Sequence, residues 1–238
     1  MNILCIIPAR GGSNGLSNKN IMPLLGKPLI GYTIEAALES KLIDKTVVST
    51  DDPKIARVAA SYKVMTIKRP KRYATDSAPI ELALRHAVRY LQTNQRYNAD
   101  IVIWLQANVP FRVKGNIDKA IRKLIKTRAD SVISITEVSC RPENMKRLLR
   151  GDKIAHLARP TEIRRQEYRN KKLYFLNGAI IAITRKALMD SEGLKGAHVY
   201  LGNDIRAIIE DRFYSFEVDD KLDFDILKGL VAVGKRRK

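Results

Sequence analysis

The chain has 238 residues, 45% of them hydrophobic, and a formal net charge of +19. This length and hydrophobic content suit one large α/β domain with a sizeable core, which we take as residues 1–238. No apolar run approaches the ~20 residues of a membrane-spanning helix, and residues 1–7 are too short for a secretory signal. We therefore expect a cytoplasmic protein with no membrane partner. The two cysteines, Cys5 and Cys140, lack the spacing of a metal or redox motif.

The positive charge leaves two interpretations open. Lys and Arg number 44 against 25 Asp and Glu, a balance that is typical of nucleic-acid-binding proteins. However, aromatic residues make up only 6% of the chain, and no motif of an RNA-reading domain is present. We therefore interpret the charge as a field that attracts anionic small molecules, and despite the charge we do not expect nucleic acid as a partner.

The first predicted element is a buried parallel strand at residues 3–7, where the chain is continuously apolar. Pro8 ends this strand, and a loop rich in glycine and positive charge follows at once. Glycine permits backbone geometry that other residues resist, and exposed N–H groups together with cations hold phosphate. The residues that predict a phosphate-binding loop are Arg10, Gly11, Gly12, Gly15 and Lys19.

This loop has two other interpretations. Residues 11–15 match the G-x-S-x-G pattern of a serine hydrolase around Ser13, but that elbow needs a helix directly after the serine. Here no helical period begins before about Pro28, and nothing marks one of the three histidines as a base. A Walker motif is absent, so the remaining alternative is a plain glycine turn with incidental charge.

Strands and helices then alternate along the chain, which indicates a parallel sheet with right-handed crossovers. Helices are predicted at residues 28–38, 53–62, 78–92 and 115–126, and strands at 46–49, 64–67, 101–105 and 131–136. Gln106 follows a central strand directly, so it lies at the edge of the sheet where ligands bind in open α/β folds.

The alternation stops at residues 137–175, which are polar, basic and too long for an ordinary connection. This segment is either a lid or an excursion that meets a partner. Beyond it we predict a strand at 178–184, a short helix at 186–189, a last strand at 213–218 and a closing helix at 222–231.

Two carboxylates, Glu217 and Asp219, stand two residues apart at the end of the predicted last strand. Side chains at this spacing in a strand point to the same face. Two hard oxygen ligands suit Mg²⁺, which keeps several waters and also binds substrate phosphates. The alternative is a solvent-facing strand edge without a ligand.

A family resemblance joins these features. The chain resembles the acylneuraminate cytidylyltransferases, a group of sugar nucleotidyltransferases that make CMP-sialic acid and related CMP-sugars. The resemblance covers nearly the whole chain. The matching motifs, in order, are IPARGGSNGLSNKN at 7–20, LGKPLI at 25–30, VSTDD at 48–52, RP at 69–70, ATD at 74–76, LQ at 105–106, NGAI at 177–180 and EVD at 217–219.

The resemblance implies a Rossmann-like, mixed but mostly parallel sheet flanked by helices, with residues 137–175 as a dimerisation arm. It also implies roles for individual residues. Catalytic phosphate-binding groups are Arg10 and Lys19; the nucleotide-binding set is Arg10, Gly11, Gly12, Ser13, Lys19, Asn20 and Arg69; the sugar-binding set is Gln106, Arg165 and Asn177; and the Mg²⁺ ligands are Asp219 and Glu217.

The implied reaction transfers CMP from CTP to the anomeric hydroxyl of an acidic 2-keto sugar, with a homodimer as the working unit. Two alternatives stay open: the same fold acting on another nucleotide or sugar, and a basic nucleic-acid-binding protein without catalysis. The chain departs from the family pattern near the expected pockets, which leaves the particular sugar open. These departures are Asn14, Pro79, Ile80 and the run Ala107, Asn108 and Val109.

Overall fold

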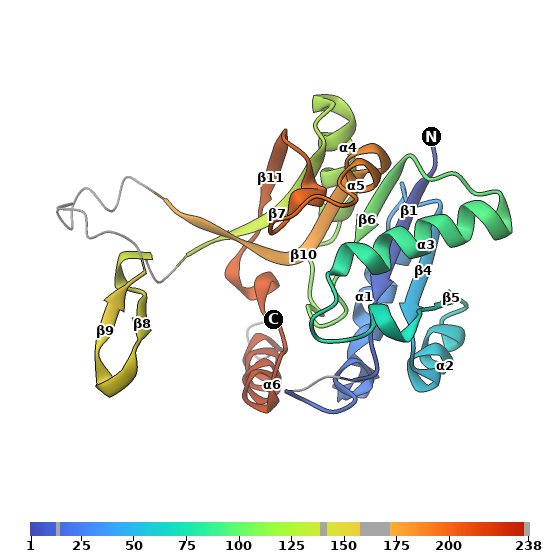
Figure 1. The fold of residues 1–238 in the computed structure, drawn as a ribbon. Coiled ribbons are helices and arrows are strands. Elements are labelled where there is room, and N and C mark those ends of the chain that lie inside the picture. The colour runs from blue at the N-terminus through green and yellow to red at the C-terminus, as the bar shows by residue number, and fades with distance from the viewer. Residues whose placement is uncertain (13–14, 139–141, 158–171, 236–238) are drawn as a thin grey trace.

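A seven-stranded sheet forms the centre of the protein in a computed structural model, which describes residues 1–12, 15–138, 142–157 and 172–235 (Figure 1). The strand order is β11-β7-β10-β6-β1-β4-β5. All neighbouring pairs are parallel except those of β10 with β6 and β7, so the predicted mixed, mostly parallel sheet is confirmed. The strands are β1 (Ile3–Pro8), β4 (Lys45–Thr50), β5 (Met65–Lys68), β6 (Ile101–Trp104), β7 (Ser131–Glu137), β10 (Tyr174–Thr184) and β11 (Ile205–Ile209).

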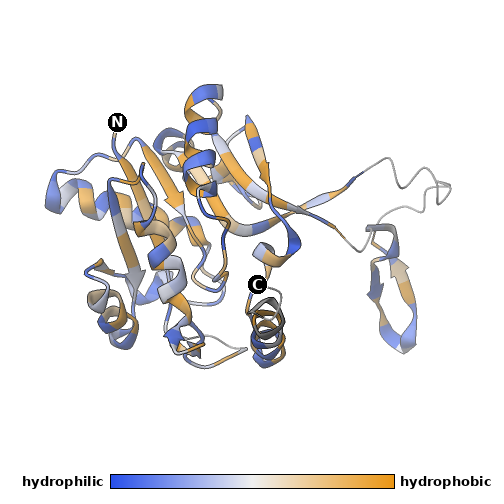
Figure 2. Ribbon diagram, turned by 180° about the vertical axis from the view of Figure 1, so that it is seen from behind, coloured by the Kyte–Doolittle hydropathy of each residue, from blue (hydrophilic) through white to orange (hydrophobic). Residues whose placement is uncertain are grey.

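Alternate residues of β1 face two separate hydrophobic cores. Ile3, Cys5 and Ile7 pack with α1, α2 and α4 on one face of the sheet, whereas Leu4 and Ile6 pack with α3 and α5 on the other. Burial on both faces is the reason that this strand is continuously apolar in sequence, and Figure 2 shows hydrophobic residues concentrated along the central strands. The helices are α1 (Leu29–Leu38), α2 (Pro53–Ser61), α3 (Ile80–Gln95), α4 (Asn116–Thr127) and α5 (Arg185–Asp190).

The predicted strand at residues 213–218 is wrong. The chain forms a short 3₁₀ helix, η7 (Arg212–Ser215), and then runs irregularly into α6 (Lys221–Lys235). Asp211 caps η7 by accepting a hydrogen bond from Phe213 N at 2.9 Å, and the Phe213 ring stacks on Phe111 with centroids 5.6 Å apart. The apolar residues here pack on loops and on α6 instead of pairing in the sheet. The edge strand is β11, in a stretch where we predicted no element, and it pairs in parallel with β7.

Of the predicted excursion at residues 137–175, the structure describes 137–138, 142–157 and 172–175, and Figure 1 shows residues 142–157 away from the body of the protein. The paired ends of β7 and β10 extend as far as Glu137 and Tyr174. Beyond them, β8 (Lys146–Leu148) and β9 (Ile154–His156) form an antiparallel hairpin that we did not predict. Leu148 is 71% exposed and Ile154 is 64% exposed, so this hairpin buries little apolar surface of its own.

Smaller elements connect this framework. None of the helices within the described ranges is long and apolar enough to cross a bilayer. The remaining elements are η1 (Lys19–Ile21), β2 (Pro23–Leu24), β3 (Lys27–Pro28), η2 (Lys71–Tyr73), η3 (Pro142–Asn144), η4 (Arg150–Asp152) and η6 (Val199–Leu201).

Candidate active site

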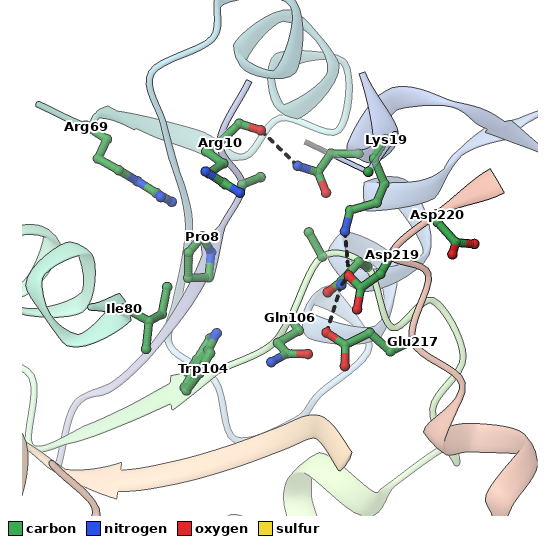
Figure 3. A pocket seen from close by; sticks show the side chains of 15 residues that line it. Pro8, Arg10, Lys19, Arg69, Ile80, Trp104, Gln106, Glu217, Asp219 and Asp220 are labelled. Carbon is green, nitrogen blue, oxygen red and sulfur yellow. Dashed lines mark hydrogen bonds and ion pairs between the residues drawn. The ribbon is translucent and has the colours of Figure 1, made fainter. Parts of the chain in front are cut away.

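A cleft of about 550 Å³ opens at the carboxyl ends of β1 and β6, where the strand order of the sheet reverses (Figure 3). This is the position at which open α/β folds bind ligands, and the volume suits a small-molecule site. The cleft is lined by three chain segments that are distant in sequence, together with Arg69 and Ile80. From the loop after β1 come Pro8, Ala9, Arg10, Gly15, Lys19 and Asn20; from β6 and the loop after it Trp104, Gln106, Ala107 and Asn108; and from the segment before α6 Glu217, Asp219 and Asp220.

Two glycines of the first loop, Gly11 and Gly15, are required by close packing. A Cβ at Gly11 would lie 2.5 Å from a carboxylate oxygen of Asp52, and one at Gly15 would lie 2.5 Å from the backbone oxygen of Asp219. Neither glycine has a positive φ, so tight approach and not left-handed geometry explains them. Gly11 N also donates to Asp51 Oδ1 at 3.0 Å, which ties the loop to the end of β4. Gly12 has open space around it, and Ser13 lies outside the described residues.

The three cations predicted to bind the nucleotide converge on the cleft, and each has a protein partner. Arg10 pairs with Asp76, and Lys19 Nζ lies 2.8 Å from Asp219 Oδ1. Arg69 is buried and donates to Ser49 through Nε at 3.2 Å and Nη2 at 2.5 Å. Burial lowers the pKa of Arg69 to about 10, with nearby Asp51 opposing this shift and Arg10 adding to it. An arginine with this pKa remains charged at neutral pH.

Asn20 positions one of these cations. Its side chain is buried, and its Nδ2 donates to the backbone oxygen of Arg10 at 3.1 Å. This hydrogen bond holds the end of the loop against its beginning. Figure 3 shows Arg10 and Arg69 gathered at one end of the cleft, whereas Lys19 lies at the other beside the carboxylates.

Glu217 and Asp219 also come together, although not for the reason that we predicted. They lie in irregular chain, and what they share is Asn108: its Nδ2 lies 2.9 Å from Glu217 Oε1 and 3.0 Å from Asp219 Oδ1. Partial removal from water raises the pKa of Glu217, and repulsion from Asp219 adds to this, while the Asn108 hydrogen bond and Lys19 oppose it. The Glu217 side chain still faces the cleft, so the shift reflects surrounding protein and not full burial.

These two carboxylates fit a divalent cation such as Mg²⁺. Both are hard oxygen ligands, both reach one amide group, and both line an open cleft with room for water and phosphate. Within the described residues, no group of three or more Asp, Glu, His or Cys side chains gathers in metal-binding geometry. A pair is sufficient for Mg²⁺, because this ion takes its remaining ligands from water and substrate.

Gln106 lies two residues before Asn108 and beside Glu217 in Figure 3, and its side chain packs against the backbone at Gly178. A Cβ at Gly178 would lie 2.2 Å from Gln106 Oε1, and Gly178 has φ +67°, so only glycine suits that position. Within the described part of the chain, Gln106 Oε1 has no hydrogen-bond partner. The side chain of Gln106 therefore lines the cleft, while its Oε1 is buried against Gly178.

Arg112 is a half-buried residue behind the cleft that we did not predict. Its guanidinium donates to backbone oxygens of Gln106 (2.7 Å), Val109 (2.6 Å) and Ala179 (2.7 Å), and to Thr33 Oγ1 (3.0 Å). Burial lowers its pKa to about 10. Arg112 therefore fixes the loop that carries Gln106 and Asn108. In sequence it resembles any surface arginine before a helix, and only the proline and aromatic residues around it hint at burial.

Of the other two predicted sugar contacts, the structure describes only Asn177. Asn177 is buried with its amide turned inward, where Nδ2 donates to Ser215 Oγ at 2.7 Å and Oδ1 accepts from Ala179 N at 3.1 Å. It does not line the cleft and supports the backbone bend at Gly178 instead. Arg165 lies outside the described residues.

Comparison with known proteins agrees with this geometry. The cytidylyltransferase family pattern matches residues 4–205. N-acylneuraminate cytidylyltransferase of Escherichia coli O18:K1:H7 is 32% identical over 249 residues, covering 99% of this chain and 54% of that protein. CMP-N,N'-diacetyllegionaminic acid synthase of Legionella pneumophila is 30% identical over 239 residues, covering 99% of this chain and 98% of that protein. The chain thus spans about half of the first relative and nearly all of the second.

One solved structure shows the same fold. CMP:2-keto-3-deoxy-manno-octonic acid synthetase complexed with CTP superposes with a TM-score of 0.74 at 19% identity, covering 98% of this chain and all of that one. The fold and the cleft thus define a nucleotidyltransferase-type α/β protein. The chain belongs to the cytidylyltransferase family.

Proposed function

We propose that this protein transfers CMP from CTP to the anomeric hydroxyl of an acidic 2-keto sugar, such as a sialic, legionaminic, pseudaminic or Kdo-like acid. The sugar oxygen attacks the α-phosphorus, a new P–O bond forms, and the bond to the β-phosphate oxygen breaks to release pyrophosphate. The observation that carries the proposal is the meeting of three cations and two carboxylates in one cleft at the switch point of the sheet.

Charge neutralisation is the main task that this reaction sets the protein. Arg10 and Lys19 flank the cleft, and each is held by a carboxylate that a triphosphate can replace. Backbone N–H groups of the glycine-rich loop add donors on the same side. Arg69 is anchored to Ser49 and keeps its charge, so it provides a fixed cation near the base or the phosphates.

Glu217 and Asp219 would hold Mg²⁺, which supplies charge stabilisation at the phosphates when it is bound. In its absence Lys19 compensates Asp219, and Asn108 donates to both carboxylates. The protein side chains therefore keep the two carboxylates aimed at the cleft before any substrate enters.

Recognition of the sugar falls to the loop after β6. The side chain of Gln106 lines the cleft there, and Arg112 holds its backbone in place. Pro8, Ile80 and Trp104 provide an apolar wall beside it (Figure 3). Ile80 departs from the family pattern, which supports a sugar substituent less polar than usual at this wall.

Pyrophosphate release tests this function. The purified protein is assayed with each of four nucleoside triphosphates against a panel of acidic 2-keto sugars, with and without Mg²⁺. We expect release only with CTP, an acidic sugar and the metal together. Release with another triphosphate favours the alternative of a changed nucleotide, and binding of nucleic acid without any release contradicts catalysis.

We also propose that residues 137–175 form a dimerisation arm on the single domain 1–238. The support comes from exposed apolar side chains on a hairpin that stands away from the body (Figure 1). Leu148, Ile154 and Leu157 are 56–71% exposed, a pattern that costs free energy unless a partner covers it. A second copy of the chain would cover it with an isologous contact.

Light scattering at micromolar concentration tests the arm. We expect a homodimer, and a double change of Leu148 and Ile154 to Ser should give monomers that keep the fold. Mixing Asp219→Ala chains with Arg165→Ala chains then asks whether each site uses both subunits, because only shared sites regain activity. A strict monomer with full activity would contradict the dimer.

A further inference from the structure

Asn108 joins the two cleft carboxylates more closely than any other described residue. One nitrogen, Nδ2, lies 2.9 Å from Glu217 Oε1, 3.0 Å from Asp219 Oδ1 and 3.3 Å from Val218 O. The backbone oxygen of Asn108 accepts a hydrogen bond from Val218 N at 2.9 Å. Asn108 therefore fixes both the backbone between the carboxylates and the carboxylates themselves.

The carboxylates need such a partner because no secondary structure orients them. The segment from Phe216 to Asp220 is irregular, so no strand pleat directs its alternate side chains to one face. Two neighbouring carboxylates also repel each other. Lys19 forms its ion pair with Asp219, and the direct hydrogen bond to Glu217 comes from Asn108. An amide has two N–H donors, which is one for each carboxylate.

The length of Glu217 matters for this contact. Aspartate at this position would withdraw the carboxylate by about one C–C bond, roughly 1.5 Å. From 2.9 Å that withdrawal exceeds the range of a useful hydrogen bond. The amide of Asn108 and the long side chain of Glu217 are therefore matched in reach.

We propose that Asn108 is the positioning residue that aims Glu217 at the divalent cation, and that Asn108 and Glu217 act as one unit. This proposal rests on the proposed function only for the identity of the cation site. It assigns to a neutral amide the task of holding two like charges ready in the metal-free protein, so that the cation enters a formed pair.

A double-mutant cycle read by Mn²⁺ binding tests the proposal. The full chain, without nucleotide, is titrated with Mn²⁺, and free Mn²⁺ is followed by electron paramagnetic resonance. The variants are Asn108→Thr, Glu217→Asp and both together. Asp219→Ala identifies the signal that belongs to this site. Asn94→Thr is the matched control, because Asn94 only donates to the Tyr90 backbone at the far end of α3.

We expect Asn108→Thr to raise the Mn²⁺ dissociation constant roughly three- to tenfold in the native background, in the range of coupling between contacting polar groups. In the Glu217→Asp background the same substitution should raise the Mn²⁺ dissociation constant less than about twofold, since the shorter carboxylate no longer reaches the amide. Asn94→Thr should change nothing. Asn108→Ser serves as a second variant. Both substitutions keep the hydrogen bond from Val218 N to the backbone oxygen of residue 108, so a change in Mn²⁺ affinity reports on the side-chain amide.

Three results would overturn the proposal: unchanged Mn²⁺ affinity in Asn108→Thr and Asn108→Ser, equal losses in both backgrounds, or no Mn²⁺ signal that Asp219→Ala removes. Failure of the proposed function looks different. In that case the protein shows the coupling in Mn²⁺ binding but releases no pyrophosphate with any sugar. If the protein turns over CTP but Asn108 and Glu217 show no coupling in Mn²⁺ binding, the proposed function stands and the role of Asn108 does not.

Discussion

Two kinds of contact hold the groups that line the cleft. Arg69 and the Gln106 loop are the fixed groups, because the guanidinium groups of Arg69 and Arg112 hydrogen-bond to backbone oxygens and to a hydroxyl group. Arg10 and Lys19 are the exchangeable groups, because they are held by ion pairs with carboxylates that are 51% and 65% exposed at the side chain. Buried, fully bonded groups resist rearrangement, whereas partly exposed ion pairs are worth little and exchange readily.

This difference matches the tasks of a transferase. A base or a sugar is recognised by shape and by hydrogen bonds, which requires groups that do not move. A triphosphate and a cation bring their own charges, which requires groups that release one partner and accept another. Substitutions in the fixed and in the exchangeable groups test this division.

Asp219→Ala should remove most of the activity and most of the Mg²⁺ dependence. The change deletes a metal ligand and the partner of Lys19, and loss of charge stabilisation at the phosphates costs several kcal/mol, or on the order of a hundredfold or more in turnover. The fold should persist because this carboxylate is exposed. Pyrophosphate release and circular dichroism measure both quantities. Glu217→Asp should be tolerated better, and near-normal turnover of folded Asp219→Ala would contradict the metal assignment.

Arg112→Met should lower the free energy of unfolding by about 2–4 kcal/mol, because it leaves several buried backbone oxygens without donors. Urea denaturation measures the loss. Arg122→Met is the control, since the Arg122 side chain is 62% exposed and should change stability by less than about 0.5 kcal/mol. If both variants have the same free energy of unfolding, Arg112 does not stabilise the loop that carries Gln106.

Lys19→Ala should weaken productive CTP binding roughly tenfold and leave the fold intact. Lysine acts here as a compact charge on phosphate, but part of its contribution is offset by the ion pair with Asp219 that must break. The KM for CTP and the turnover number measure this loss. Lys27→Ala, which removes an ion pair with Glu35 outside the cleft, is the control. Unchanged CTP affinity in Lys19→Ala would count against the loop as the phosphate site.

Many of the residues around the exchangeable groups could be predicted from sequence. A continuous apolar run that opens into glycine and charge needs no distant information, and Arg10, Lys19 and Asn20 do meet in the cleft. The pairing of Glu217 with Asp219 was also predicted, but from a strand that does not exist. Proximity in sequence brought the two carboxylates together, and a distant residue, Asn108, aligned them.

The fixed groups were harder to predict because their contacts join segments far apart in sequence. Arg112 bonds Ala179, 67 residues away, and nothing local distinguishes it from a surface arginine. Strand β11 was missed for a related reason: it is a short edge strand with exposed Ile205 and Ile209, and only its pairing with β7 defines it. Conversely, the apolar residues between 213 and 218 satisfied a strand pattern while packing against Phe111 and α6.

The smallest expected effect concerns the other exchangeable pair, Arg10 with Asp76. Asp76→Asn should raise CTP affinity about two- to threefold, because a partly exposed ion pair contributes under about 1 kcal/mol and its loss frees Arg10 for phosphate. The single tryptophan, Trp104, lines the cleft, so its fluorescence reports CTP binding. The gain should shrink at high salt, where charges are screened.

The control for this change is Asp190→Asn, which removes an exposed pair with Lys186 far from the cleft and should leave CTP affinity unaltered. Weaker CTP binding in Asp76→Asn would contradict the assignment of Arg10 to the exchangeable groups. It would mean that Asp76 holds Arg10 in its working position, so that this cation belongs with Arg69 among the fixed groups and Lys19 alone exchanges its partner.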